Sequence, residues 1–145
     1  METFVKSFEE LTKEELMQIL RLRCEVFVVE QKCFYPDIDG VDEGAYHVFI
    51  NDEGRLEAYL RLYPYDDTTA KIGRVVARSR KRGYGAAVMR AGIAAAHEKL
   101  GAEKVLVEAQ CQAIGFYEKL GFKVISEEFM DAGIPHKKMI LEDLL

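Results

Sequence analysis

The stretch Arg80-Lys81-Arg82-Gly83-Tyr84-Gly85-Ala86-Ala87 decides the fold, because it joins an apolar segment at 72–77, typical of a strand, to a long Ala-rich segment at 84–100, typical of a helix. Glycines at 83 and 85 let the backbone come close to a ligand, and the first turn of a helix has amide N–H groups without a helical acceptor. The positive end of the helix dipole and three basic side chains strengthen the same electric field. The stretch therefore predicts a binding site for a pyrophosphate.

Two other phosphate-binding loops do not fit this stretch. Neither Gly-x-x-x-x-Gly-Lys-Ser/Thr nor Gly-x-Gly-x-x-Gly can be read there. A nucleotide-binding regulatory domain is therefore only weakly supported. A tight turn from strand to helix, with no ligand, is the structural alternative for a pattern of two glycines.

The length and composition indicate one domain, 1–145, long enough to bury about 68–70% of the surface of its unfolded chain. Hydrophobic residues make up 49% and charged residues 31%, so neither a disordered tail nor a linker is indicated. The longest apolar runs fall far short of a membrane span, and the first residues lack the profile of a signal peptide. We therefore expect a cytoplasmic protein with no membrane partner.

The charge distribution and the cysteines exclude further classes of protein. The net charge is −5 and the basic residues are scattered outside segment 71–82, which argues against a nucleic-acid surface and favours a small anionic ligand. Cys24, Cys33 and Cys111 form no Cys-x-x-Cys pair, so we expect neither a disulfide framework nor a zinc site. The carboxylate-rich loop at 37–43 has its glycine two places too early for a calcium-binding loop. No metal is therefore expected.

The pattern of apolar residues predicts an α/β fold of the mixed, α+β kind. A capping box at Thr12 and Glu15 begins a first helix that is expected to run toward Phe27. Gly73, inside a strand, indicates a bulge or a close approach of another backbone. Strands are expected at 2–8, 46–50, 56–63, 71–77, 103–109, 122–128 and 137–141, and two more helices at 84–100 and 111–120. This order predicts a mostly antiparallel central sheet flanked by helices on both faces, and it disfavours a purely parallel sheet.

A second motif, Ala113-Ile114-Gly115-Phe116-Tyr117-Glu118-Lys119-Leu120-Gly121-Phe122, follows the first after one expected helix and one expected strand. It resembles the Ala-Ile-x-Phe/Leu-Tyr-x-x-Leu-Gly-Phe run of the GNAT superfamily of N-acetyltransferases, whose Arg/Gln-x-x-Gly-x-Gly/Ala signature is matched by Arg80, Gly83 and Gly85. The segments 22–31, 35–42, 72–75 and 133–136 look like the ElaA-like branch of the superfamily. The resemblance thus spans most of the chain.

This resemblance implies a GNAT-type acyl-CoA N-acyltransferase fold, with acetyl-CoA as co-substrate. In the superfamily the amides of the first motif hold the pyrophosphate of acetyl-CoA, and many members carry an Asn near the pantetheine where Gln110 stands. Tyr117 is implied as the acid that protonates the departing sulfur, and a core tyrosine is its structural alternative. The residues implied for the cofactor are Val75, Val76, Arg80, Lys81, Arg82, Gly83, Tyr84, Gly85, Ala86 and Gln110.

The general base is not identified by the resemblance. Many members carry a glutamate on the strand before the phosphate-binding loop, but the segment 71–77 has none. His47, Glu108 and His136 are the candidates, each against an ordinary structural placement. The base therefore stays open at the level of sequence.

The acceptor is expected near the carboxylate-rich loop, because the family places it between this region and the closing hairpin. Asp37, Asp39 and His47 are the residues we expect to bind it, since carboxylates attract a cationic amine. The alternatives are a solvated loop whose carboxylates cap turns, or ion pairs of these carboxylates with Arg61 and Arg74.

The sequence thus predicts an N-acetyltransferase that transfers the acetyl group of acetyl-CoA to a primary amine by direct attack in a ternary complex. The rival from another class is an acyl-CoA-binding regulatory module without transferase activity, which the missing strand glutamate supports. The sequence leaves open whether the amine belongs to a small molecule or a peptide, and whether the chain forms a homodimer.

Overall fold

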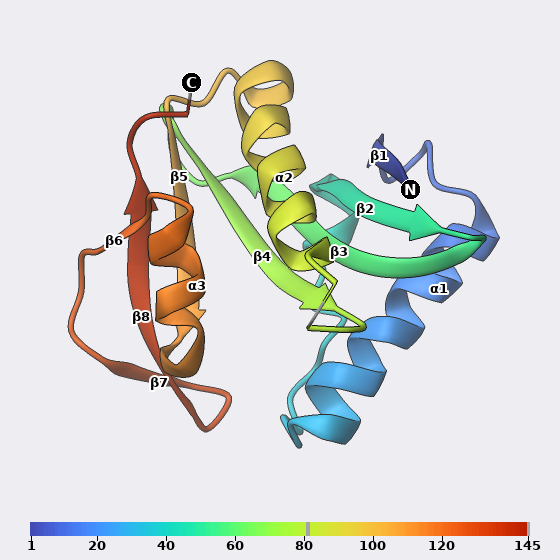
Figure 1. Ribbon diagram of the computed structural model, residues 1–145, viewed down its shortest axis with the longest axis horizontal. Coiled ribbons are helices and arrows are strands. Elements are labelled where there is room, and N and C mark those ends of the chain that lie inside the picture. Colours follow the sequence, from blue (N-terminus) through green and yellow to red (C-terminus); the bar gives the residue numbers. More distant parts are fainter. Residues whose placement is uncertain (81, 145) are drawn as a thin grey trace.

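The computed structural model describes residues 1–80 and 82–144 and consists of one sheet with helices against it (Figure 1). A π-helical segment, Cys24–Glu30, continues the first helix, and short 3-10 turns lie at Asp42–Gly44 and Cys111–Ala113. The other elements, in chain order, are β1 (Glu2–Ser7), α1 (Lys13–Arg23), β2 (Tyr46–Asp52), β3 (Arg55–Pro64), β4 (Thr69–Ala77), α2 (Tyr84–Leu100), β5 (Lys104–Gln110), α3 (Ile114–Lys119), β6 (Lys123–Val124), β7 (Phe129–Asp131) and β8 (Ile134–Leu141).

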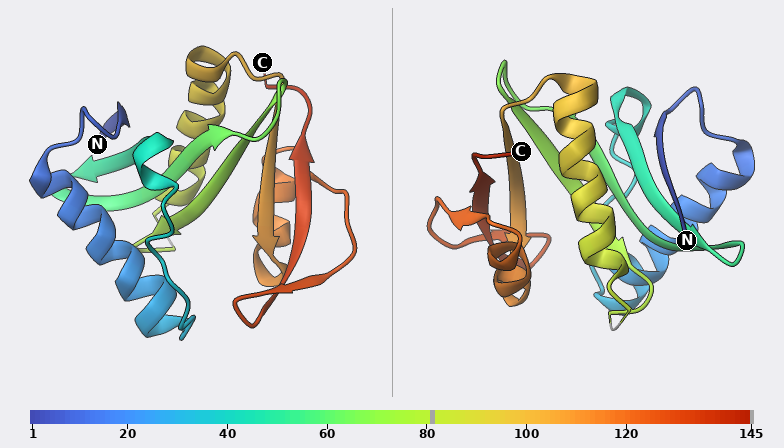
Figure 2. Two further views of the ribbon diagram at one scale, coloured as in Figure 1. Left: turned by 180° about the vertical axis from the view of Figure 1, so that it is seen from behind. Right: turned by 45° about the horizontal axis from the view of Figure 1, so that its top comes forward.

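The sheet is mixed and largely antiparallel, as predicted. Its strand order is β1-β2-β3-β4-β5-β8-β6, and β7 also pairs with β8. The only parallel pair among the described strands is β4 with β5, which α2 connects as a crossover. Figure 2 shows α1 and α2 on opposite faces of the sheet.

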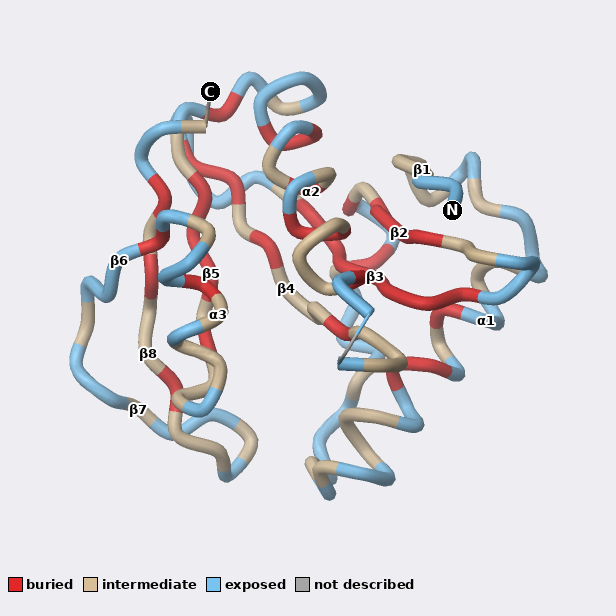
Figure 3. The backbone as a smooth tube through the Cα atoms, viewed as in Figure 1, coloured by how far each residue is buried: buried red, intermediate tan, exposed pale blue. Residues whose placement is uncertain are grey.

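Each face of the sheet has its own hydrophobic core. The first core lies under α2 and α3 and contains Leu60, Ile72, Val107 and Tyr117. The second core lies under α1, where Ile19 and Leu22 pack against alternate side chains of β2 and β3. Figure 3 shows the buried positions concentrated in the central strands. None of the helices in the described part of the chain is long and apolar enough to cross a membrane.

A bulge interrupts β4, as the glycine in this strand predicted. The register shifts between the pairs Tyr59–Val76 and Arg61–Gly73, because β4 has one residue more than β3 in this interval. Arg74, inside the interval, has a φ of +51°, the left-handed backbone that one class of bulge uses. The bulge therefore turns the end of β4 away from its earlier direction.

The same strand separates from β5 at this point. Parallel pairing begins at Thr69–Lys104 and ends at Ile72–Val107. Beyond the last pair the two strands diverge (Figure 1). Backbone groups on both sides of the divergence have no partner strand, so a ligand can pair with them.

The helix predicted at 111–120 begins as a 3-10 turn and is α-helical only at Ile114–Lys119, β8 begins at Ile134 and not at 137, and β7 was not predicted. Two other predicted elements differ more. The first helix keeps its predicted capping box, but the α-helix ends at Arg23 and continues as the π-helical segment, in which the Val29 side chain is 71% exposed. The expected strand at 122–128 pairs with β8 only at Lys123–Val124. In both places apolar side chains are exposed and do not pack in the core. An apolar residue in the sequence does not by itself show that a packing partner is present in the fold, so the pattern predicted longer regular elements than the structure has.

Candidate active site

The start of α2 is an uncapped helix N-terminus. Gly83 precedes the helix with a φ of +76°, and the first helical hydrogen bond runs from the Ala87 amide to the Gly83 carbonyl at 3.1 Å. The amides of Tyr84, Gly85 and Ala86 therefore have no helical acceptor. No side chain in the described part of the chain caps them, in contrast to α1 with its capping box. This arrangement can bind an anion through main-chain donors.

Side chains at this end of α2 add positive charge or anchor the helix. Arg80 is 80% exposed, with a single loose ion pair to Glu30 at 4.0 Å, and Arg82 is exposed as well. Lys81 lies outside the described residues. The Tyr84 side chain is buried, and its hydroxyl donates a hydrogen bond to Asp52 at 2.5 Å. Only the amide of Tyr84 is thus available to a ligand.

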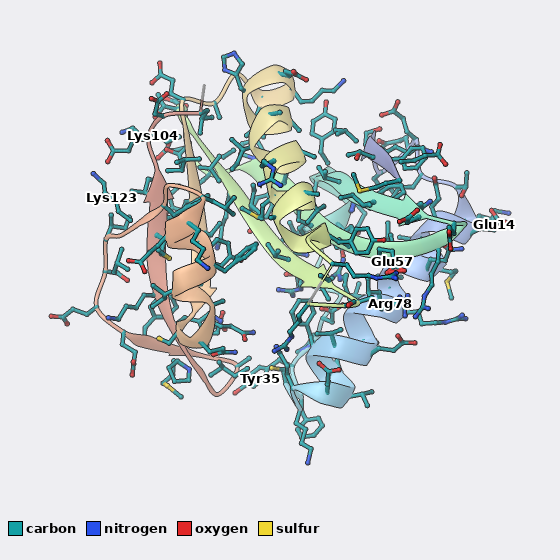
Figure 4. All side chains as sticks on the ribbon, viewed as in Figure 1. Glu14, Tyr35, Glu57, Arg78, Lys104 and Lys123 are labelled. Atoms are coloured by element: carbon teal, nitrogen blue, oxygen red, sulfur yellow. The ribbon has the colours of Figure 1, made fainter. Side chains whose placement is uncertain are left out.

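The end of β4 leads into this loop. Val76 packs in the second core and Val75 packs against the first, so their side chains point to opposite faces and only their backbones border the divergence from β5. Arg78 lies beside Glu57 (Figure 4), where its amide donates to the Glu57 carbonyl at 2.8 Å. This bond fixes the direction in which the chain leaves the sheet.

The two sequence motifs meet in space. A Cβ placed at Gly85 would lie 3.7 Å from the ring of Phe116, so the first turn of α2 contacts α3 directly. Tyr117 follows on α3, 7% exposed and packed edge-on against Phe116 and Phe122 at ring distances of 5.1 and 5.7 Å. The short helix therefore touches the predicted phosphate site through Phe116, and the next residue, Tyr117, places its phenol in the core behind that contact.

The Tyr117 side chain is buried and its hydroxyl is protonated. Burial raises the pKa of the phenol to about 12. No residue in the described part of the chain forms a hydrogen bond with this hydroxyl. It is not among the fully buried side-chain atoms without a hydrogen-bond partner, which in the described residues belong to Asn51, Arg61 and Arg74, so the hydroxyl still reaches the surface, where a ligand can bind it.

Gln110 ends β5 and is paired across the divergence. The side-chain amide of Gln110 donates to the Gln31 Oε1 at 3.0 Å, and that of Gln31 donates back to the Gln110 Oε1 at 3.3 Å. Gln112 also donates to the Gln110 Oε1, at 2.5 Å. Gln31 follows the π-helical segment, so this pair connects the α1 side of the molecule to β5. Sequence reasoning missed Gln31, because a single polar residue after an apolar run carries no signal of such a partner.

Asp37 and Asp39 lie in a cluster of ion pairs. Arg23 contacts Asp37 at 2.9 Å, and Arg61 contacts Asp39 at 2.7 Å. Arg74 contacts both carboxylates, at 3.0 and 3.2 Å. The charge of these aspartates is therefore already balanced, which is the alternative that the sequence left open for Arg61 and Arg74.

Asp42 completes this cluster beneath the loop. It is buried, and it contacts Arg23 at 2.8 Å and Arg61 at 3.2 Å. Burial raises the pKa of Asp42, but hydrogen bonds and charges of the two arginines outweigh burial and lower it overall. Arg23 is fully buried on the apolar stripe of α1, and a buried arginine needs a carboxylate. That position was the available sequence signal for the cluster.

His47 is enclosed by the same cluster. One ring nitrogen lies 2.7 Å from the Tyr59 hydroxyl and the other 2.9 Å from the Asp42 carbonyl oxygen. Its side chain is fully buried, and burial lowers the pKa of the imidazole. Both nitrogens thus already have partners inside the protein.

The two other candidate bases lie on the opposite half of the sheet. His136, on β8, stacks on Phe129, and its Nδ1 lies 2.7 Å from the Ile134 carbonyl oxygen. Glu108, on β5, accepts a hydrogen bond from Lys71 Nζ at 2.9 Å and keeps 25% of its side chain exposed. Residues 1–80 and 82–144 contain no group of His, Cys, Asp and Glu side chains arranged to hold a metal ion.

Comparison with known proteins gives matches over nearly the whole chain. Residues 8–143 match the model of the Acetyltransferase (GNAT) domain. Protein ElaA of Escherichia coli is 37% identical over 141 residues, which cover 92% of this chain and 91% of ElaA. The crystal structure of an acyl-CoA N-acyltransferase from Pseudomonas aeruginosa has a TM-score of 0.88 and 36% identity, covering 97% of this chain and 99% of that one.

A more distant solved structure shares the fold. It is an aminoglycoside 6'-N-acetyltransferase complexed with coenzyme A, with a TM-score of 0.73, 16% identity, and coverage of 95% of this chain and 96% of that one. The arrangement of sheet and helices is thus found in proteins that differ greatly in sequence.

Proposed function

This chain belongs to the GNAT family of acetyltransferases, on its ElaA-like branch, and from that premise we propose that it transfers the acetyl group of acetyl-CoA to a primary amine by direct attack in a ternary complex. Its fold is the GNAT acyl-CoA N-acyltransferase fold. The observation that carries the proposal is the contact between the uncapped start of α2 and α3, because it joins the main-chain anion donors, through Phe116, to the helix that carries the buried phenol.

The start of α2 would hold the diphosphate of acetyl-CoA. The free amides of Tyr84, Gly85 and Ala86 can donate to phosphate oxygens, and Gly83 leaves the approach open because a Cβ there would meet no atom within 4 Å. Arg80, Lys81 and Arg82 are proposed to add charge. Main-chain groups of Val75 and Val76, together with Gln110, are proposed to bind the pantetheine where β4 and β5 diverge.

The chemistry asks little of the protein beyond positioning and proton transfer. A thioester is already activated, so the amine nitrogen can attack its carbonyl carbon directly, and orientation of two bound reactants is worth about 7 to 11 kcal/mol. As the C–S bond breaks, the electron pair stays on sulfur. Tyr117 is proposed to give its hydroxyl proton to that sulfur, which its unpaired hydroxyl supports.

The acceptor is proposed to bind between the loop that carries Asp37 and Asp39 and the turn between β7 and β8. The arginines that pair with these two aspartates weaken their attraction for a cation, so we expect them to shape this side of the site more than to select charge. His47 would act through the same loop, since its own nitrogens are occupied.

The test is release of coenzyme A from acetyl-CoA in the presence of a panel of primary amines, small molecules and peptides, with mass spectrometry of each amine. We expect at least one amine to gain one acetyl group at the rate at which coenzyme A appears. The rival function, an acyl-CoA-binding regulatory module, predicts binding of acetyl-CoA with no amine-dependent release.

A further inference from the structure

Glu108 stands at the point where β4 and β5 separate. The last parallel pair is Ile72–Val107, so Glu108 is the first residue of β5 beyond the pairing. Val107 points into the first core, under α2 and α3, and successive side chains of a strand point to opposite faces. The Glu108 carboxylate therefore lies on the face of the sheet away from α2.

Tyr117 lies on the other face. It belongs to the same core as Val107, whereas Glu108 points away from that core. A thioester that enters the divergence from the α2 side would thus have a phenol on one side and a carboxylate on the other. Acetyl transfer to an amine uses such an arrangement. The amine nitrogen and the leaving sulfur are bound to the same carbon, but the nitrogen must lose a proton and the sulfur must gain one, so the base and the acid act at different places.

One oxygen of the Glu108 carboxylate is already bound to a primary ammonium. Lys71, on β4, donates to Oε1 at 2.9 Å, and both side chains remain partly exposed. Oε2 has no hydrogen-bond partner in the part of the chain that the structure describes. An acceptor amine, which has the same head group as lysine, can bind to that free oxygen.

Basic residues flank Glu108 on both neighbouring strands. Lys71 faces it from β4, and Lys138 is its register partner on β8. Tyr63, on β3, interacts with Lys71. Burial lowers the pKa of Lys71, but its hydrogen bond to Glu108 outweighs burial and raises the pKa. Lys71 therefore stays protonated, and its hydrogen bond holds the Glu108 carboxylate in place.

The two histidines are less suited to the same task. His47 has both ring nitrogens bonded inside the protein. His136 lies on β8, where its register partner on β5 is Gln110, so it is one strand farther from β4 than Glu108 is. The Phe129 ring stacks on its imidazole. Geometry thus leaves Glu108 as the titratable group closest to the divergence among these three.

We propose that Glu108 is the general base of the reaction and that Lys71 is its positioning residue. This inference rests on the proposed function. The acceptor ammonium binds at Oε2 and passes one proton to the carboxylate, directly or through one water molecule, as its nitrogen forms the bond to the thioester carbon. The C–S bond breaks, and the sulfur takes the proton of Tyr117. The nitrogen then gives its second proton to water, which leaves a neutral amide. Glu108 releases its proton to solvent and the Tyr117 phenolate takes one up from solvent, so both groups return to their starting states and one proton is released overall.

The first experiment measures kcat/KM against pH for Glu108→Gln, with an amine that the wild-type protein acetylates. We expect a loss of about 100-fold at neutral pH, within the range for a general base, and a deficit that narrows toward the pKa of the amine, where the amine no longer needs a base. Affinity for acetyl-CoA should stay at the wild-type value. Glu108→Asp, which keeps the carboxylate, should restore part of the rate.

The second experiment tests Lys71→Met. Removal of the ammonium leaves the Glu108 carboxylate without its positioning partner, so kcat/KM should fall by about tenfold, and this loss should vanish in the Glu108→Gln background, where the carboxylate is already absent. A purely structural role of Lys71 would lower the melting temperature and give the same loss in both backgrounds. Glu142→Gln is the matched control, because Glu142 forms a similar pair with Lys123 at 2.8 Å at the sheet edge and should leave the profile unchanged.

The outcomes separate this inference from the proposed function. Wild-type protein that releases no coenzyme A with any amine overturns the proposed function and the inference together. An active wild type with an equally active Glu108→Gln variant overturns the inference alone. The inference also fails if His136→Gln, and not Glu108→Gln, lowers kcat/KM.

Discussion

At the scale of single residues, Tyr117 has the most specific proposed task. Replacement by phenylalanine removes one hydroxyl and keeps the aromatic contacts with Phe116 and Phe122. We predict that Tyr117→Phe lowers kcat by at least about tenfold, since a positioned acid typically contributes 10²- to 10⁴-fold. Acetyl-CoA affinity, measured by calorimetry, should be unchanged within about twofold.

The matched control for this substitution is Tyr35→Phe, which removes the same hydroxyl group from a residue that is 64% exposed on the loop after the π-helical segment. Its rate should match that of the wild type. A Tyr117→Phe variant with full turnover would remove the acid role and leave Tyr117 as a core residue. Because burial raises its pKa to about 12, the phenol stays protonated at neutral pH and its ionisation should not limit the rate there.

Asp42 is the residue on which the buried ion pairs depend most. Replacement by asparagine leaves Arg23 and Arg61 short of a charge partner in the interior. We predict that Asp42→Asn lowers the free energy of unfolding by about 3 to 5 kcal/mol, the usual cost of breaking a buried pair. Urea unfolding measures this change, and Asp67→Asn on an exposed turn is the matched control.

The same cluster makes stability depend on pH. The hydrogen bond from Arg61 lowers the pKa of Asp39. Burial raises the pKa of Asp42, but its contacts with Arg23 and Arg61 outweigh burial and lower that pKa as well. Carboxylates with lowered pKa values stabilise the folded protein fully above the unfolded pKa of about 3.9, and this stability is lost as pH falls through the folded values. Wild-type stability should therefore fall below about pH 4, with a smaller slope in Asp42→Asn. Equal slopes in both proteins would contradict the coupling.

Individual residues were predictable from sequence where one residue type is required locally. A left-handed backbone before α2 favours glycine, so Gly83 was evident from its motif. The environment of His47 was not, because its partners Tyr59 and Asp42 come from other segments and meet it only after the sheet has formed. The site roles assigned to Asp37, Asp39 and His47 stay predictions for the same reason.

At the scale of elements, the start of α2 is the feature that the account needs most. A glutamate at Gly83 would place a carboxylate among the amides proposed to bind the diphosphate, and repulsion should weaken acetyl-CoA binding by about tenfold or more. Gly101→Glu is a matched control at the other end of the same helix, where the glycine also has a positive φ, +62°, and no atom within 4 Å of its Cβ position.

Both variants should lose similar stability, because each forces a side chain into a left-handed backbone at a cost of about 1 to 2 kcal/mol. Calorimetric titration with acetyl-CoA should therefore distinguish them while their melting temperatures stay alike. Equal binding by the two variants would show that the start of α2 does not hold the diphosphate.

The strongly patterned elements were predicted well. The residues of α2 were predicted at 84–100, because an alanine-rich stretch between two glycines is compatible with little else. The π-helical segment and the shortness of β6 were not predicted. The π-helical segment ends in local main-chain hydrogen bonds, such as that from the Cys33 amide to the Phe27 carbonyl oxygen at 3.0 Å, and the pattern of apolar residues does not report such bonds.

At the scale of the whole molecule, the site is assembled from both halves of the chain. The hairpin of β2 and β3 and the helix α1 support the ion-pair cluster, while β5 supplies Glu108 and α3 supplies Tyr117. The pair of Gln31 and Gln110 joins these halves across the divergence of β4 and β5. The architecture could be anticipated from the order of elements and from the family resemblance, whereas the pairing of side chains across the halves required the folded structure.

The measurement that tests the central claim most directly is a thermal melt of the wild-type protein with acetyl-CoA, with ATP as the comparison ligand. A ligand that binds only the folded state at one hundred times its Kd stabilises by about 2.7 kcal/mol. We predict a clear rise in melting temperature with acetyl-CoA and with coenzyme A, and little change with ATP. Protection by ATP but not by acetyl-CoA, or no shift with either, would contradict the account.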